Sequence, residues 1–239
     1  METKINLKHI LFLDIETVPE KRSFSEVSDL KQNLFAEKTK YQRKDEFSAE
    51  EFYERAGIWA EFGKIVCISV GFFEISGKDR KLRVKSFFGD DEVKILNDFI
   101  HLLEQFFNQK HHLLCAHNGK EFDFPYLARR MIINNIALPE KLNLFGKKPW
   151  EVAHLDTLEM WKFGDYKHYT SLNLLTNILG IASPKEDIDG SQVAKVYYKE
   201  NDVERIAKYC ENDVLAVAQV LLRFMNLELL KEEEVIRVS

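Results

Sequence analysis

The sequence has few cysteines and no long apolar run. Its three cysteines, Cys67, Cys115 and Cys210, lie far apart and show none of the spacings of a zinc site. Each lies in an apolar stretch, so we expect buried thiols in a reducing compartment. No run approaches the ~18 apolar residues of a transmembrane helix, and the N-terminus lacks the apolar core of a signal peptide. We therefore expect a cytoplasmic protein with no membrane partner.

A surplus of positive charge is also missing. The 239 residues include 34 Lys and Arg against 39 Asp and Glu, so the net charge is −5. This balance excludes binding of nucleic acid through a strongly basic surface alone. It leaves open an enzyme that acts on nucleic acid through metal-binding carboxylates. A chain of this length needs no disulfide or structural metal to bury a core.

Hydrophobic patterning predicts an α/β fold with a mixed five-stranded sheet flanked by helices. The turn at residues 76–79 predicts a hairpin, so the first three strands should be antiparallel and the later ones parallel. The predicted strands cover residues 9–15, 64–74, 82–88, 112–116 and 152–156. The predicted helices cover residues 90–108, 122–135, 170–180, 191–199 and 201–225. Gly180 is expected to act as the C-cap of the third helix.

One segment interrupts this order. Residues 20–56 are highly charged, with scattered Phe and Leu at helical spacing, and Ser48-Ala-Glu-Glu51 is typical of a capping box. We expect a partly mobile helical insertion, and a solvated, disordered segment is the alternative. Residues 1–239 are expected to form a single domain that carries this insertion. The acidic segment Lys231-Glu-Glu-Glu234 is expected to be a frayed tail.

Two carboxylates interrupt the first strand. Asp14 and Glu16 lie two residues apart, so alternation places both side chains on one face of the strand. Burial of two such charges is costly unless a divalent cation compensates them. A lone Asp-x-Glu is usually at the surface, but the Ile-Leu-Phe-Leu run before Asp14 argues against that placement.

Other polar residues have structural explanations when each is taken alone. Asp123 stands at a helix start, where N-terminal capping would account for it. Tyr209 and Asp213 are four residues apart and therefore share one helix face. Taken alone, Tyr209 could be a half-buried core residue and Asp213 a solvated surface charge. Asp156 ends the fifth strand, and a helix cap is favoured there over a supporting role at a site.

Together, three short motifs are far more specific: Asp14-x-Glu16, Asn118-x-x-x-Phe-Asp123 and Tyr209-x-x-x-Asp213. They resemble the exonuclease motifs of the DEDD superfamily. The chain resembles DnaQ-like 3′–5′ exonucleases, and most of all the exonuclease domains of family B DNA polymerases and their stand-alone bacterial relatives. Lys208 stands where a histidine variant would have His, so the third motif is the tyrosine (DEDDy) variant. The resemblance covers about residues 9–225 and implies a ribonuclease H-like fold, with the segment at 20–56 as the main departure.

The resemblance implies a two-metal-ion phosphodiester hydrolase. The expected metal ligands are Asp14, Glu16, Asp123 and Asp213. Oxygen ligands of this kind suit two Mg²⁺ or Mn²⁺ ions and do not suit zinc. By similarity, Asp14 would bridge both ions, Glu16 and Asp213 would hold one, and Asp123 would support the other. Tyr209 would orient the attacking water, which completes the expected catalytic set of Asp14, Glu16, Asp123, Tyr209 and Asp213.

The implied substrate is the single-stranded 3′ end of a nucleic acid, with DNA favoured over RNA. The family would seat this end through Thr17, Asn118 and Phe122, although Phe122 could equally belong to the core. DNA repair, proofreading beside a polymerase and trimming of RNA are all compatible with the motifs. A catalytically silent module that binds nucleic acid or a partner is the alternative, but all five catalytic motif residues are in place. Candidate phosphate contacts, most of them expected to be ordinary surface charges, are Lys120, Arg129, Arg130, Lys147, Lys148, Lys162 and Lys167.

Overall fold

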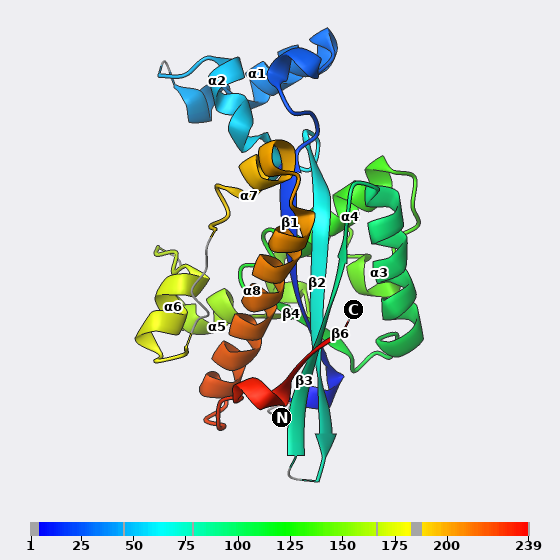
Figure 1. Cartoon of the computed structure of the whole chain (residues 1–239), viewed down its shortest axis with the longest axis vertical. Coiled ribbons are helices and arrows are strands. Elements are labelled where there is room, and N and C mark those ends of the chain that lie inside the picture. Colours follow the sequence, from blue (N-terminus) through cyan, green and yellow to red (C-terminus); the bar gives the residue numbers. More distant parts are fainter. Residues whose placement is uncertain (1–4, 45, 78, 166, 183–187, 239) are drawn as a thin grey trace.

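A mixed sheet forms the centre of the molecule (Figure 1). The computed structural model describes residues 5–44, 46–77, 79–165, 167–182 and 188–238. Within these ranges six strands pair in the order β5-β4-β1-β2-β3-β6. The strands are β1 (Ile10–Pro19), β2 (Gly63–Ser76), β3 (Asp79–Phe88), β4 (Leu113–Ala116), β5 (Leu155–Asp156) and β6 (Val235–Val238). Strands β1, β2 and β3 are antiparallel, whereas β4, β5 and β6 pair in parallel, so the predicted fold class is confirmed.

The C-terminal segment differs from the prediction. Residues Glu232–Glu234 form a short 3-10 helix, and β6 then pairs with β3, with Val235 opposite Leu82. The prediction of a frayed tail and of only five strands is therefore wrong. Four residues of strand after an acidic run give too short a pattern to be recognised, and the pairing with β3 supplies the missing stabilisation.

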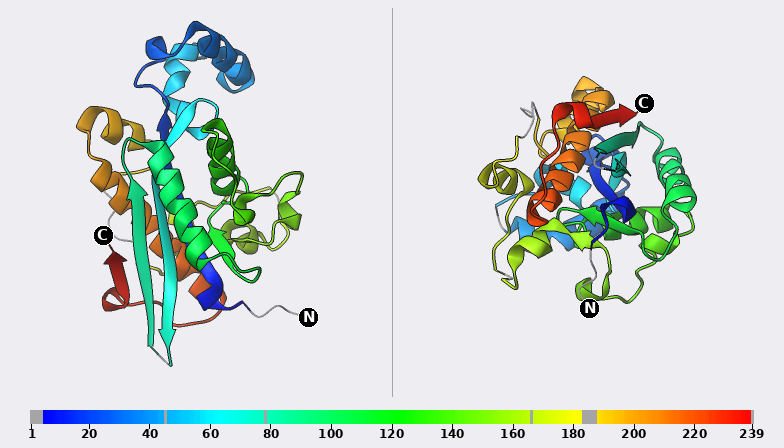
Figure 2. Two further views of the ribbon diagram at one scale, coloured as in Figure 1. Left: turned by 90° about the vertical axis from the view of Figure 1, so that its right-hand side faces the viewer. Right: turned by 90° about the horizontal axis from the view of Figure 1, so that it is seen from below.

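Helices cover both faces of the sheet. Helices α3 (Glu92–Phe106) and α4 (Asp123–Ile133) pack on one face, and α8 (Val203–Phe224) packs on the other. Figure 2 (left) shows α3 lying along the β2–β3 hairpin. The alternation of β1 sorts its side chains between the two layers. Leu11 and Leu13 face α3 and α4, whereas Ile10 and Phe12 face α8.

Shorter helices connect the sheet to α8. They are α5 (Thr157–Lys162), α6 (Leu172–Ile178), α7 (Val193–Lys195) and a π-helical turn at Val196–Glu200. The sequence pattern predicts α6 and the α7 region but not α5, which is only six residues long. Gly180 follows α6 with a φ of 64°, a conformation that favours glycine, as expected for this helix end.

The charged segment is helical and has its own core. It contains α1 (Asp29–Arg43), α2 (Ala49–Phe52) and the 3-10 helix η3 (Tyr53–Ile58), at the top of Figure 1. Phe35 is fully buried and contacts the rings of Phe24, Tyr53, Trp59 and Phe62. Ser48 and Glu51 form the predicted capping box. The assignment of residues 1–239 to one domain stays a prediction.

The predicted burial of the three thiols is confirmed, because Cys67, Cys115 and Cys210 are all buried and free. The reducing compartment stays a prediction. Among the described helices, none combines the length and the apolar character required to cross a bilayer.

Candidate functional site

The α8-facing side of β1 carries two acidic residues. Ile10 and Phe12 begin this series, and the alternation continues it through Asp14 and Glu16. Glu16 is 8% exposed and Asp14 is half-buried. The sequence prediction that both carboxylates share one partly buried face agrees with this placement.

Helix α8 crosses the same end of β1. The Cys210 thiol donates to the Asp14 carbonyl and to Asp14 Oδ2, each at 3.3 Å. Ligand atoms of Asp14, Glu16 and Cys210 all lie within 4.8 Å of one another. Tyr209 and Asp213 lie on this helix on either side of Cys210, so the third motif reaches β1 through a direct contact.

Asp123 approaches the cluster from α4. It is the first residue of this helix and is 3% exposed. The N-cap is Phe122, and the Asp123 carboxylate lies close enough to the backbone of Ile15 on β1 for that backbone to lower its pKa, against the larger effect of burial, which raises it. The capping interpretation therefore does not account for Asp123, because its side chain is directed to the strand that carries Asp14 and Glu16.

The electrostatics show that the four carboxylates lie close together. Burial raises the pKa of Asp14 well above its ordinary value, and the charges of Asp213, Asp123 and Glu16 raise it further. Burial raises the pKa of Asp123 to about 7, with further contributions from Asp156 and Asp213. Such a cluster favours either bound protons or a divalent cation.

The turn between β4 and α4 carries the predicted substrate-seating residues. Asn118 has a φ of 62°, and a Cβ on Gly119 would lie 2.4 Å from the Ala116 Cβ, so the turn needs glycine there. Phe122 is half-buried, and its ring centroid lies 5.3 Å from that of Tyr126. Phe122 thus packs on the core and retains an exposed edge.

Thr17 has a structural partner. Its hydroxyl donates to the Gly57 carbonyl at 2.8 Å, and the Tyr126 hydroxyl donates to the same oxygen at 2.7 Å. These bonds fasten η3 to β1 and α4. The role of Thr17 in seating a substrate stays a prediction.

Three neighbouring residues were not identified from the motifs. Asp156 caps α5, as favoured from the sequence, but it also accepts hydrogen bonds from the turn that contains Asn118. His117 contacts Thr157 Oγ1 at 2.9 Å through Nδ1 and the Thr170 carbonyl at 2.8 Å through Nε2. These contacts span about 40 residues or more of sequence, so no local pattern could predict them.

Tyr169 is the third of these residues. It is 66% exposed, and its ring centroid lies 6.5 Å from that of His117. Partial burial raises the pKa of its phenol, and the charges of Asp123, Asp156 and Asp213 raise it further. An exposed aromatic ring therefore lies within electrostatic range of the carboxylate cluster.

Two of the candidate phosphate contacts have structural partners. Arg130 is buried and forms a two-pronged ion pair with Glu92, with Nε donating to Glu92 Oε1 at 2.8 Å. Lys120 forms an ion pair with Glu159 at 2.7 Å. Arg130 is therefore wrong as a phosphate contact.

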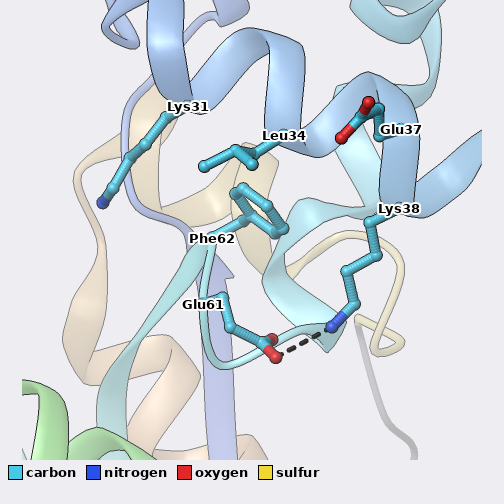
Figure 3. Close-up of a pocket in the computed structure, with 6 residues that line it drawn as sticks. All are labelled: Lys31, Leu34, Glu37, Lys38, Glu61 and Phe62. Atoms are coloured by element: carbon cyan, nitrogen blue, oxygen red, sulfur yellow. Dashed lines mark hydrogen bonds and ion pairs between the residues drawn. The ribbon is translucent and has the colours of Figure 1, made fainter.

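An open pocket lies elsewhere, between α1 and the start of β2 (Figure 3). Its volume is about 610 Å³, and its lining residues are Lys31, Leu34, Glu37, Lys38, Glu61 and Phe62. Lys38 and Glu61 form an ion pair of 2.8 Å across it. No motif residue lines this pocket, so it is not the carboxylate site.

The fold and the cluster agree with a known family. A family model described as a predicted 3′–5′ exonuclease related to the exonuclease domain of PolB matches residues 58–236. The chain belongs to this family. The match includes the second and third motifs and begins after Asp14 and Glu16. The resemblance to the exonuclease domains of family B DNA polymerases is thus confirmed.

A solved structure shares the fold over most of the chain. The family B DNA polymerase of the hyperthermophilic archaeon Pyrobaculum calidifontis is similar over 90% of this chain, with a TM-score of 0.54 and 17% identity. This likeness concerns the fold. The match covers only 25% of the length of that polymerase chain.

Proposed function

We propose that this chain is a metal-dependent 3′–5′ exonuclease. It would hydrolyse the terminal phosphodiester bond at the single-stranded 3′ end of a nucleic acid, with DNA favoured over RNA, and release nucleoside monophosphates. The observation that carries this proposal is the convergence of Asp14, Glu16, Asp123 and Asp213 from β1, α4 and α8. Family membership supports the direction of hydrolysis, and the fold shared with a DNA polymerase supports the choice of DNA.

The residues fit divalent cations. Asp14, Glu16, Asp123 and Asp213 would hold Mg²⁺ or Mn²⁺, because their oxygen donors suit hard ions. Burial and then the charges of the other three carboxylates raise the pKa of Asp14, and a bound cation would relieve both effects. When bound, such ions activate water and neutralise charge on the phosphate. Cys210 keeps its proton and donates to Asp14, which orients that carboxylate.

The remaining motif residues would orient the reactants. Tyr209, one turn before Asp213 on α8, would position the attacking water with its hydroxyl. Asn118 and Phe122 would seat the terminal nucleotide, and the exposed ring of Tyr169 would contact a base. The proposed role is in repair or beside a DNA polymerase, and the family's relation to a polymerase exonuclease domain supports it.

Digestion of end-labelled oligonucleotides tests this proposal. We expect stepwise shortening of single-stranded DNA from its 3′ end with Mg²⁺ or Mn²⁺, slower shortening of RNA of the same sequence, and no reaction in EDTA. Asp14→Ala controls for contaminating nucleases. Undiminished activity in excess chelator, or rapid cutting of circular single-stranded DNA, would refute the proposal. Tight binding of 3′ ends without cleavage would identify a silent module instead.

A further inference from the structure

Asp156 makes more hydrogen bonds than a helix cap requires. Its side chain is 2% exposed and lies at the end of β5, beside Ala116 of β4. Oδ1 accepts from the amides of Leu158 at 2.9 Å and Glu159 at 3.2 Å, which caps α5. Oδ1 also accepts from the Asn118 amide at 3.0 Å, and Oδ2 accepts from the Lys120 amide at 3.0 Å.

Oδ2 of Asp156 takes no part in the cap of α5, and its bond from the Lys120 amide belongs to the turn. Ser or Asn would cap α5 as well as Asp does, and Ser48 and Ser171 cap α2 and α6 in this chain. A capping role therefore requires only Oδ1. The bond from the Lys120 amide to Oδ2 is the part that a carboxylate supplies and that a hydroxyl cannot.

Residues that follow Asp156 in the sequence contact the turn at two more points. The Lys120 ammonium group pairs with Glu159, and His117 lies between Thr157 and the Thr170 carbonyl. Residues 117–120 are thus held from outside the β4–α4 unit by contacts with Asp156, Thr157, Glu159 and Thr170. Asp156 binds amides on both sides of Gly119, so the turn cannot rotate about this glycine without breaking one of these partly buried hydrogen bonds.

We propose that Asp156 is a positioning residue that fixes the Asn118–Lys120 turn in the geometry that seats the 3′-terminal nucleotide. This inference rests on the proposed exonuclease function. The effect of Asp156 falls on substrate binding more than on turnover, because its hydrogen bonds go to the Asn118 and Lys120 amides of the turn and not to the carboxylates of the cluster.

The variant Asp156→Asn separates the two roles. Its Oδ1 keeps the cap of α5, and its amide group stands against the Lys120 amide, where two donors repel. Asp91→Asn is the matched control, since Asp91 is an exposed cap of α3 that accepts from the Lys94 amide at 3.0 Å. Hydrogen exchange of the Lys120 amide should accelerate roughly tenfold or more in Asp156→Asn, as for the loss of one hydrogen bond, and stay unchanged in Asp91→Asn.

The kinetic test uses a double-mutant cycle. Asp156→Asn should raise KM for single-stranded DNA roughly tenfold, with kcat within about threefold of the wild type. Asn118→Gly removes the side chain and is unstrained at this positive φ. If Asp156 acts through Asn118, Asn118→Gly should add little to the KM of Asp156→Asn, whereas independent roles would add.

The outcomes are distinct. Wild-type exchange at Lys120 in Asp156→Asn, or additive effects on KM, would overturn the positioning role. Wild-type protein that neither cleaves nor binds 3′ ends would overturn the exonuclease function itself, and with it any seating role for Asp156, whatever the exchange measurement shows.

Discussion

Asp14 and Tyr209 differ in what their removal takes from the site. Asp14 lies among three other carboxylates, and Asp14→Ala should lower kcat by ~10⁴-fold or more because a shared metal ligand is lost. Tyr209→Phe keeps the ring and should lower kcat by roughly 10²–10³-fold, the effect of one positioned donor. Single-turnover kinetics and calorimetric titration with Mn²⁺ check both. Loss of metal binding in Tyr209→Phe would mean that the Tyr209 hydroxyl supports the metal ligands and does not orient the attacking water.

The carboxylate cluster predicts an unusual pH dependence of stability. Burial raises the pKa of Asp123 from about 4 in the unfolded chain to about 7 in the folded protein. The folded state therefore binds more protons in this range, and this stabilisation is lost as pH rises through about 7. In EDTA, Tm should fall as pH rises from about 4 to about 7 and level off above pH 7, and Asp123→Asn should flatten this fall. Equal slopes for both proteins would contradict the expectation.

Tyr169 offers a test of the substrate side. Tyr169→Ala should raise KM for single-stranded DNA by about 5–100-fold, the equivalent of one stacked base, whereas Tyr169→Phe should remain near the wild type. Phe145→Ala is the control, because Phe145 is similarly exposed, at 74%, on the loop after residues Glu140–Leu142. Equal KM values for Tyr169→Ala and the wild type would exclude a base contact.

At the scale of elements, α4 depends on one buried ion pair. Glu92 at the start of α3 accepts from Arg130 and also from the Ile65 amide at 2.7 Å, which joins α3, α4 and β2. Glu92→Gln should lower the free energy of unfolding by about 3–5 kcal/mol, because the Arg130 charge stays buried. Urea unfolding checks this, with exposed Arg129→Ala as a control expected within about 0.5 kcal/mol. A loss well below this range for Glu92→Gln would contradict the prediction and would mean that water hydrates the Arg130 guanidinium group in the variant.

The elements also show what a sequence can predict. Long periodic segments such as β2 and α8 have enough residues for their patterns to be clear. By contrast, β5 has two residues, against a predicted five, and β6 has four. Their conformations depend on partners in β4 and β3, which local periodicity does not contain.

For the molecule as a whole, the sequence predicts the carboxylate cluster but not its supports. Alternation along β1 explains why Asp14 and Glu16 share a face, and the fold brings Asp123 and Asp213 to them. The supports join residues far apart in sequence, such as Asn118 with Asp156 and Thr17 with Gly57. Such contacts follow from the packing of whole elements, so a single sequence does not show them.

The shared Gly57 carbonyl limits how this protein can diverge. Helices α1 and α2 pack around an aromatic core, whereas the connections that flank α1 can change in length at little entropic cost. Gly57 itself approaches the backbone of Val18 so closely that a Cβ would lie 3.1 Å from it. Changes of length are therefore expected in these connections and not within the packed helices, whereas a shift of one residue at Gly57 would remove the hydrogen bonds of both Thr17 and Tyr126.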